Sequence, residues 1–252
     1  MARARTQPTV IVRQGDLVVE RDPRRASGRL LRQEDMDASY VDLADPTHLE
    51  FDYLRWIRIV LRTAGARRVL HVGGGACTLA RALAAEDPDG RQEVWEANAE
   101  VLAIAREHLG LRRARGLRVR HGDGREHLAS QIGASWQAVV VDAFIGAAVP
   151  RRLVTVQALA DISRVAPLAL INVVDNRAAQ NVRRIAAGVA EVYPHTWTVG
   201  ARVGNTIVAG ARGALDLGRI RVAAAADRSP ARLMPPGALA PLLVGIPPWY
   251  DE

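Results

Sequence analysis

Short apolar runs alternate with amphipathic stretches through the middle of the chain. Five runs have the length and residue types of strands: RRVLHV (67–72), QEVWEA (92–97), GLRVRH (116–121), WQAVVVDA (136–143) and PLALINVV (167–174). Stretches with helical periodicity follow them near 76–86, 98–109, 124–131 and 177–191. Strands that alternate with helices predict βαβ units, and therefore an α/β fold with a mainly parallel sheet covered on both faces.

The pattern before residue 67 predicts two further elements. Residues 8–20 form two short β-type runs around Gln14-Gly15-Asp16, which predicts a hairpin. Asp45 is expected to cap a helix and Pro46 to occupy its first position, because these residue types favour those positions. Apolar residues at helical spacing then continue this helix to Leu61.

The C-terminal part is less regular. Two β-type runs, 195–201 and 204–210, are expected to pair antiparallel at the edge of the sheet. The organisation predicted is an N-terminal β-hairpin segment over 1–44, a nucleotide-binding domain over 45–212 and a C-terminal extension over 213–252.

Composition narrows the class of protein. The chain has 252 residues, of which 49% are apolar and 24% charged, as expected for a globular protein with a sizeable core. No window approaches 18 uninterrupted apolar residues, so we expect no membrane span and a cytoplasmic protein. The single cysteine, Cys77, excludes a disulfide framework and a cysteine-based metal site, and we expect no metal.

The net charge of +7 invites a nucleic-acid interpretation, but the distribution of charge weakens it. All 34 basic residues are arginine, they are scattered in short clusters, and aromatic residues make up only 4% of the chain. Proteins that bind single strands use aromatic side chains for stacking. We therefore expect no nucleic-acid binding.

A glycine-rich loop and an acidic residue indicate a nucleotide site. Gly73, Gly74 and Gly75 follow the first parallel strand and open the next helix, where they allow a tight turn and a close approach of the backbone to a ligand. Glu96 ends the next strand, where an acidic residue can accept hydrogen bonds from a ribose diol. The alternatives are a tight turn without a ligand and a solvated carboxylate.

Three aspartates follow later strands. Asp123, in HGDGREHL, either contacts the ligand or caps the next helix. Asp142 ends the fourth parallel strand, at the edge where ligands of open α/β sheets bind. Asp175, in NVVDN, either acts as a base or caps the helix that follows.

Taken together, these motifs resemble the spermidine synthase family, particularly the spermidine-synthase-like proteins of high-GC bacteria. The residues that carry the resemblance are ASYVDLADPTHLEFDYLRW, VLHVGGGACTLAR, VWEANAEVLAIAREHLGL, RVRHGDGREHL, VVVDAF and GNTIVAG. The resemblance covers roughly residues 8–210. It implies a Rossmann-like, class I methyltransferase-type fold: a seven-stranded sheet preceded by a small β-rich N-terminal segment.

The resemblance also implies roles for single residues. The loop Gly73–Gly75 would approach the methionine-derived part of an S-adenosyl nucleotide, and Glu96 would hold the ribose hydroxyls. Asp123 would bind the adenine amine, with Gly124 giving room. Asp142 matches the first carboxylate of the family's D-x-x-D motif.

Two tyrosines of the N-terminal motif are candidates for an acceptor pocket. They are Tyr40 and Tyr53, although the spacing of Tyr53 favours the core face of a helix over the pocket.

Two departures from the family pattern concern the amine acceptor. The second carboxylate of D-x-x-D is replaced by Ile145, and the aspartate that usually follows the third glycine by Ala76. An amine is protonated near pH 7, so its attack requires a proton acceptor, which these two side chains cannot be. Asp142 or Asp175 is then the candidate base.

Three functions are consistent with this sequence. The first is a spermidine-synthase-like transferase that takes S-adenosylmethionine or its decarboxylated form as donor and moves an aminopropyl-type group to a small amine acceptor. The second is a methyltransferase for small molecules, and the third a nucleotide-binding regulator without catalysis. We expect a homodimer.

Overall fold

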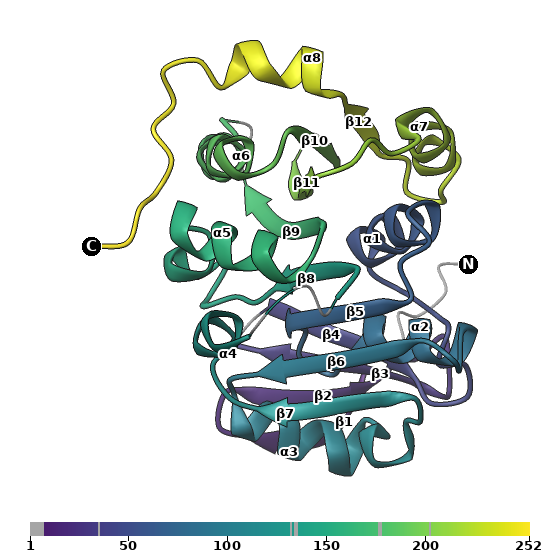
Figure 1. The fold of residues 1–252 in the computed structure, drawn as a ribbon. Helices are drawn as coiled ribbons and strands as arrows, with labels where there is room; N and C mark the ends of the chain where they lie inside the picture. Colours follow the sequence, from purple (N-terminus) through teal and green to yellow (C-terminus); the bar gives the residue numbers. More distant parts are fainter. Residues whose placement is uncertain (1–7, 35, 132, 134–135, 176–177, 202) are drawn as a thin grey trace.

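Two β-sheets organise the computed structural model, which describes residues 8–34, 36–131, 133, 136–175, 178–201 and 203–252 (Figure 1). The larger sheet has eight strands in the order β12-β10-β11-β9-β8-β5-β6-β7. From one edge to the other these are β12 (Arg232–Met234), β10 (His195–Gly200), β11 (Gly204–Ala211), β9 (Leu168–Asp175), β8 (Ala138–Asp142), β5 (Arg68–Gly73), β6 (Arg91–Glu96) and β7 (Leu117–His121).

Helices cover both faces of this sheet (Figure 1). They are α1 (Asp52–Thr63), α2 (Thr78–Glu86), α3 (Ala99–His108), α4 (Gly124–Ser130), α5 (Val156–Val165), α6 (Gln180–Val192), α7 (Leu217–Ala225) and α8 (Pro236–Leu239), with short 3-10 turns η1 (Leu111–Arg113), η2 (Arg151–Leu153) and η3 (Ala240–Leu242). None of the helices in the described part of the chain combines the length and the apolar character needed to cross a membrane.

The strand and helix alternation predicted for the middle of the chain is confirmed. β9, β8, β5, β6 and β7 run parallel, and β11 enters antiparallel between β9 and β10. The apolar runs allowed this prediction because strands buried on both faces have few polar positions. β12 adds an eighth strand to the expected seven, and the Ala- and Pro-rich tail gave no periodicity from which this three-residue strand could be predicted.

The N-terminal segment forms a four-stranded antiparallel sheet rather than a single hairpin. Its strands are β1 (Thr9–Gln14), β2 (Leu17–Arg21), β3 (Gly28–Gln33) and β4 (Met36–Asp42). The hairpin around Gly15 is confirmed, with that glycine at φ +57°. Its inner residues, Leu17, Val19, Leu31 and Val41, pack on the apolar sides of α2 and α3.

The predicted helix start at Asp45 and Pro46 is wrong. Helix α1 begins at Asp52, and the Asp45 carboxylate instead accepts hydrogen bonds from the backbone N–H and the hydroxyl of Thr47. Aspartate favours the N-cap position because its carboxylate accepts hydrogen bonds from nearby backbone N–H groups. In Asp45 the same property closes a local turn instead.

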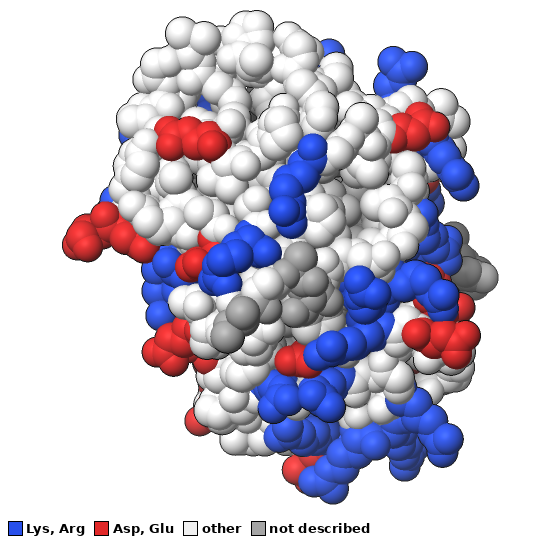
Figure 2. All heavy atoms as spheres, in the orientation of Figure 1, with Lys and Arg blue, Asp and Glu red and all other residues white. Residues whose placement is uncertain are grey.

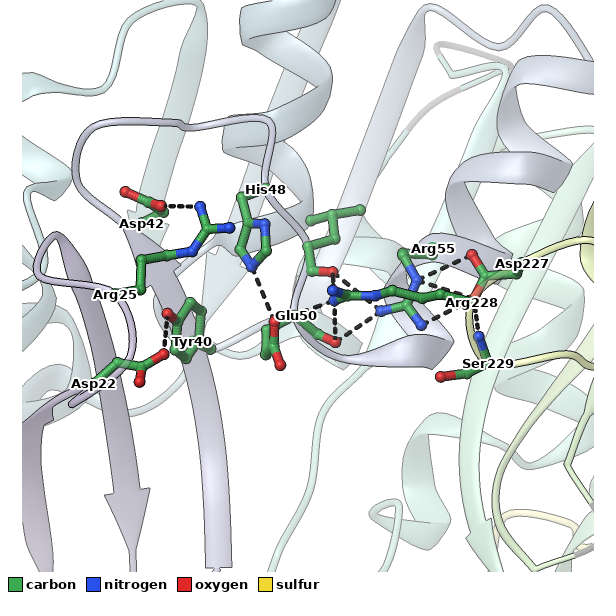
Figure 3. A network of polar contacts seen from close by, with 11 residues as sticks. Asp22, Arg25, Tyr40, Asp42, His48, Glu50, Arg55, Asp227, Arg228 and Ser229 are labelled. Atoms are coloured by element: carbon green, nitrogen blue, oxygen red, sulfur yellow. Dashed lines mark hydrogen bonds and ion pairs between the residues drawn. The ribbon is translucent and has the colours of Figure 1, made fainter. Parts of the chain in front are cut away.

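The segment that leads into α1 is held by a chain of ionic contacts (Figure 3). The Arg55 guanidinium, only 7% exposed, pairs with Asp227 and donates to the Leu49 and Glu50 carbonyls. Arg228 contacts the Glu50 carboxylate, which also contacts His48. Residues from the loop after α7 therefore fix the approach to the first turn of α1.

We expect Asp227→Ala to lower the free energy of unfolding by about 3–5 kcal/mol, because Arg55 would keep its charge inside the protein without a partner. The matched control is Arg62→Ala, since Arg62 is 60% exposed where it pairs with Glu86 and its loss should cost under about 1 kcal/mol. Urea denaturation of both variants measures the difference. Equal losses would mean that the Arg55–Asp227 pair does not hold this segment.

Candidate functional site

A cavity of about 940 Å³ opens at the carboxyl ends of the parallel strands. At its base Gly73, the last residue of β5, pairs with Asp142, the last residue of β8. The chain leaves β5 toward β6 on one side, while β8 lies on the other, so this is the point where the strand order reverses. The β3–β4 turn, with Glu34 and Asp37, and the start of α1 supply the opposite wall.

The glycine loop has a backbone that other residues rarely adopt. Gly73, Gly74 and Gly75 have φ values of +78°, +120° and +54°. A Cβ atom on Gly73 would lie 2.6 Å from the Asp142 carbonyl oxygen, and one on Gly75 would lie 2.5 Å from the Ser39 Oγ. Glycine therefore suits the conformation of the whole loop, and at position 73 it also allows the close approach of β5 to β8.

Glu96 ties this loop to the end of β6. Its Oε2 accepts a hydrogen bond from the Gly75 N–H at 3.1 Å, and its Oε1 accepts one from the Asn98 N–H at 2.9 Å. Burial raises the pKa of the Glu96 carboxyl. The backbone of Ala97 also hydrogen-bonds this carboxylate, and of its roughly four lone-pair sites one stays for a ligand hydroxyl, which is compatible with the predicted ribose contact.

Asp123 is the N-cap of α4, as the structural alternative for this residue predicted. Its Oδ1 accepts hydrogen bonds from the N–H groups of Arg125 and Glu126, and its Oδ2 pairs with Arg152. Partial burial opposes ionisation, but Arg152 and the amides hold the pKa of Asp123 below its usual range. Asp123 also lines the cavity, and its predicted contact with adenine stays a prediction.

Gly124 allows α4 to begin directly against β5. A Cβ atom there would lie 2.3 Å from the Val72 Cγ1. The space left by the missing side chain of Gly124 is thus filled by Val72 of β5. This helix–strand contact lies beside the part of the cavity that Asp123 lines.

Asp142 ends β8 and pairs with Gly73 of the glycine loop. Its Oδ2 accepts a hydrogen bond from the Tyr53 hydroxyl at 3.2 Å, and its Oδ1 accepts one from the Asn172 Nδ2 at 2.9 Å. Burial, with a smaller contribution from the charge of Glu96, raises the pKa of Asp142 to about 6 against the two hydrogen bonds. Such a carboxylate is ionised at neutral pH and can still take up a proton there.

Asn172 and Asn205 are site residues that sequence reasoning missed. The Asn205 Nδ2 donates to the Asn172 Oδ1 at 3.0 Å, and both side chains line the cavity with Asp142. The available signal was an asparagine inside PLALINVV, since a polar residue in a strand buried on both faces needs specific partners.

Tyr53 is brought to the cavity, whereas Tyr40 and Asp175 are not among its lining residues. The Tyr40 hydroxyl donates to the Asp22 carboxylate at 2.7 Å inside the N-terminal sheet (Figure 3). The Asp175 Oδ2 accepts hydrogen bonds from the N–H groups of Asn181 and Val182 in the first turn of α6, although the N-cap position itself is Ala179.

The two departures from the family pattern lie in different surroundings. Ile145 is 75% exposed at the cavity mouth, in a bridge to Ala148. Ala76 is buried in the core between α2 and the N-terminal sheet, and its N–H donates to the Ser39 hydroxyl. A carboxylate is therefore compatible with position 145 and incompatible with position 76 unless the core rearranges.

Two reactive residue types near the loop are inert. His71 is buried and paired with Gln92, and burial lowers its pKa to about 4, so the imidazole is neutral. Burial raises the pKa of the Cys77 thiol to about 12, so it is not a nucleophile.

The cavity has the opposite charge to the chain as a whole. Arginine dominates the lower half of the face in Figure 2, and the net charge of the chain is +7. The described lining residues nevertheless include a single arginine, Arg152, which is paired with Asp123. The carboxylates among them are Glu34, Asp37, Asp52, Glu96, Glu100, Asp123 and Asp142. This lining favours a cationic ligand.

Solved structures share this architecture. Across 98% of its length the chain matches 97% of a probable spermidine synthase from Corynebacterium glutamicum, with 26% identity and a TM-score of 0.86. It matches a spermidine synthase in complex with the transition state analogue AdoDATO (14% identity, 81% of this chain and 74% of that chain, TM-score 0.62). It also matches human methyltransferase-like protein 13 in complex with SAH (17% identity, 79% and 94%, TM-score 0.56).

No protein-family model and no curated protein matches the chain. The structural matches confirm the class I methyltransferase-type fold and the resemblance to the spermidine synthases.

We expect Asp142→Asn to stabilise the protein at pH 8 by up to about 3 kcal/mol. The pKa of this carboxyl is about 6 in the folded protein against 3.8 in the reference state, so ionisation opposes folding increasingly from pH 4 to pH 6. Asparagine removes that cost, and the advantage should disappear near pH 4. Denaturant titrations at both pH values measure it, and a difference independent of pH would contradict the raised pKa.

Proposed function

We propose that this chain, whose fold is that of the spermidine synthases, transfers an aminopropyl-type group from an S-adenosyl sulfonium nucleotide to an amine acceptor. The observation that carries the proposal is the acidic cavity inside a basic protein. A sulfonium donor and an amine acceptor are both cationic, and seven lining carboxylates against one paired arginine favour binding of both.

The residues fit the nucleotide part of such a donor. The loop Gly73–Gly75 lies before the N-terminus of α2 and leaves its backbone uncovered by side chains. Glu96 presents its carboxylate oxygens beside this loop. Asp123 lines the cavity at the start of α4, at the position expected for the adenine amine. These three groups come from the ends of β5 and β6 and from the start of α4.

The charge of the lining favours decarboxylated S-adenosylmethionine over the intact molecule. The intact donor carries a carboxylate that would meet Asp52 and Asp142, whereas the decarboxylated donor ends in an ammonium group. Arg152, the arginine of the described lining, already pairs with Asp123 and so offers little compensation. This is the reason to prefer aminopropyl transfer to methyl transfer.

Asp142 is the residue that we assign to proton transfer. The donor supplies a carbon activated by positively charged sulfur, and its carbon–sulfur bond breaks with the electron pair going to sulfur as the amine nitrogen attacks. Asp142 takes the proton that the amine must lose, while Tyr53 stays a neutral donor, since burial and the nearby Asp142 charge raise its pKa well above the usual value. A protein that only binds the nucleotide has no need of a carboxylate whose ionisation opposes folding.

The test is a donor comparison. Purified protein with decarboxylated S-adenosylmethionine and a panel of amines should release methylthioadenosine, and should show a larger thermal shift with this donor than with S-adenosylmethionine. Release should fall below about pH 6, where Asp142 becomes protonated. A preference for the intact donor, with formation of S-adenosylhomocysteine, would support the methyltransferase instead.

The isoleucine at position 145 predicts a low rate of transfer to small diamines. With putrescine we expect slow transfer, because the residue that usually completes D-x-x-D is absent from the cavity mouth. Ile145→Asp should accelerate transfer to putrescine, by up to about 10²–10⁴-fold if the missing base alone limits the rate. The position is 75% exposed, so the fold tolerates the charge.

Ile145→Asn is the matched control for that substitution, because it has the same shape as the aspartate without its charge. It should stay as slow as the natural protein. Rapid spermidine formation by the natural protein would show that Asp142 suffices as base, and equal gains in both variants would show that size rather than charge limits the reaction.

A further inference from the structure

We propose that Asn205 is a positioning residue for the proposed transfer, because through Asn172 it fixes the direction of the hydrogen bond that reaches Asp142. The inference rests on the proposed function for its catalytic meaning. The structural part of the inference is that the Asn205 amide, two strands away, controls the Asp142 carboxylate. This part can be measured without any transfer reaction.

The three side chains lie in a row across three adjacent strands. Asp142 ends β8, Asn172 is in β9 and Asn205 is in β11. Asn172 is fully buried and pairs in register with Ile207, two residues beyond Asn205 on the same face of β11. The contacts run from Asn205 Nδ2 to Asn172 Oδ1 at 3.0 Å and from Asn172 Nδ2 to Asp142 Oδ1 at 2.9 Å.

The chemistry of the amides sets one direction for the whole row. An ionised carboxylate can only accept hydrogen bonds, so Asn172 must turn its NH₂ group toward Asp142. Its oxygen then faces Asn205, which must donate. In Asn205→Ala the Asn172 oxygen would lose the donor that fixes it, and the amide would be held toward Asp142 less firmly. In Asn205→Asp the new carboxylate would attract the Asn172 NH₂ group, and the amide would turn round. The oxygen would then face Asp142 and favour the protonated acid.

The other groups around Asp142 do not compensate for such a change. Tyr53, from the start of α1, donates one hydrogen bond and stays neutral. His71 from β5 is neutral, and the Cys77 thiol before α2 stays protonated. Glu96 from β6 carries a like charge, which raises the pKa of Asp142 further. Loss of the amide hydrogen bond therefore moves that pKa upward.

The experiment compares Asn205→Ala and Asn205→Asp with the natural protein, and it uses Thr206→Ala on the same strand as control. The first readout is the titration of the Asp142 carboxyl by ¹³C NMR without substrates, identified by the signal missing from Asp142→Asn. We expect the pKa to rise by about one unit in Asn205→Ala, and by more in Asn205→Asp, which adds a charge and cannot donate. Thr206→Ala should leave it unchanged.

The second readout is the pH dependence of kcat for transfer. In Asn205→Ala the fall in kcat at low pH should begin about one unit higher, with kcat at high pH close to that of the natural protein. Asn172→Ala should give a shift in the same direction, and adding Asn205→Ala to it should give no further shift, because the two residues act in series.

Three results would overturn the proposal. They are an unchanged Asp142 titration in both Asn205 variants, a loss of kcat that is equal at every pH, and additive shifts in the double variant. The NMR titration needs no substrate. If the natural protein transfers nothing, the proposed function fails while the control of Asp142 by Asn205 is still decided.

Discussion

The site depends on how closely β5 runs beside β8 where both strands end. Gly73 lies opposite Asp142, and a Cβ atom at position 73 would come within 2.6 Å of the Asp142 carbonyl oxygen. From Gly73 the chain turns through three glycines with positive φ, Gly75 donates to Glu96, and α2 begins beside the cavity. The Asp142 side chain lines the same cavity. The nucleotide loop and the candidate base are thus brought together by the pairing of β5 with β8.

The second constraint is electrostatic. Burial makes ionisation of Asp142 unfavourable, and the charge of Glu96 adds to that cost. A cationic ligand would reverse the balance, because each positive charge bound there is attracted by the carboxylates and stabilises Asp142 in its ionised form. The arginines of the surface do not oppose this attraction strongly, since solvent and salt screen their charges over about 10 Å. The basic surface therefore does not prevent the acidic cavity from attracting a cationic ligand.

The central strands β5, β8 and β9 could be predicted from the sequence because parallel strands buried on both faces are mostly apolar. The strands β6 and β7, toward the edge, keep short β-type runs with charged positions. The strands β3 and β4 were missed because their outward arginines and aspartates hide the alternation, and β12 because it spans three residues. Glu96, Asp142 and the glycine loop were found because their place at strand ends follows from the topology. Asn172 and Asn205 were missed because hydrogen bonds between side chains of different strands depend on register, which the order of residues does not encode locally.

A crystal structure with decarboxylated S-adenosylmethionine bound tests the central claim most directly, namely that the acidic cavity is the site of a sulfonium donor. The account predicts the ribose hydroxyls on Glu96, the adenine beside Asp123 and Gly124, and the sulfonium with its aminopropyl chain above Asp142. A nucleotide bound outside this cavity would contradict the account. So would a donor bound inside it with its sulfonium turned away from Asp142.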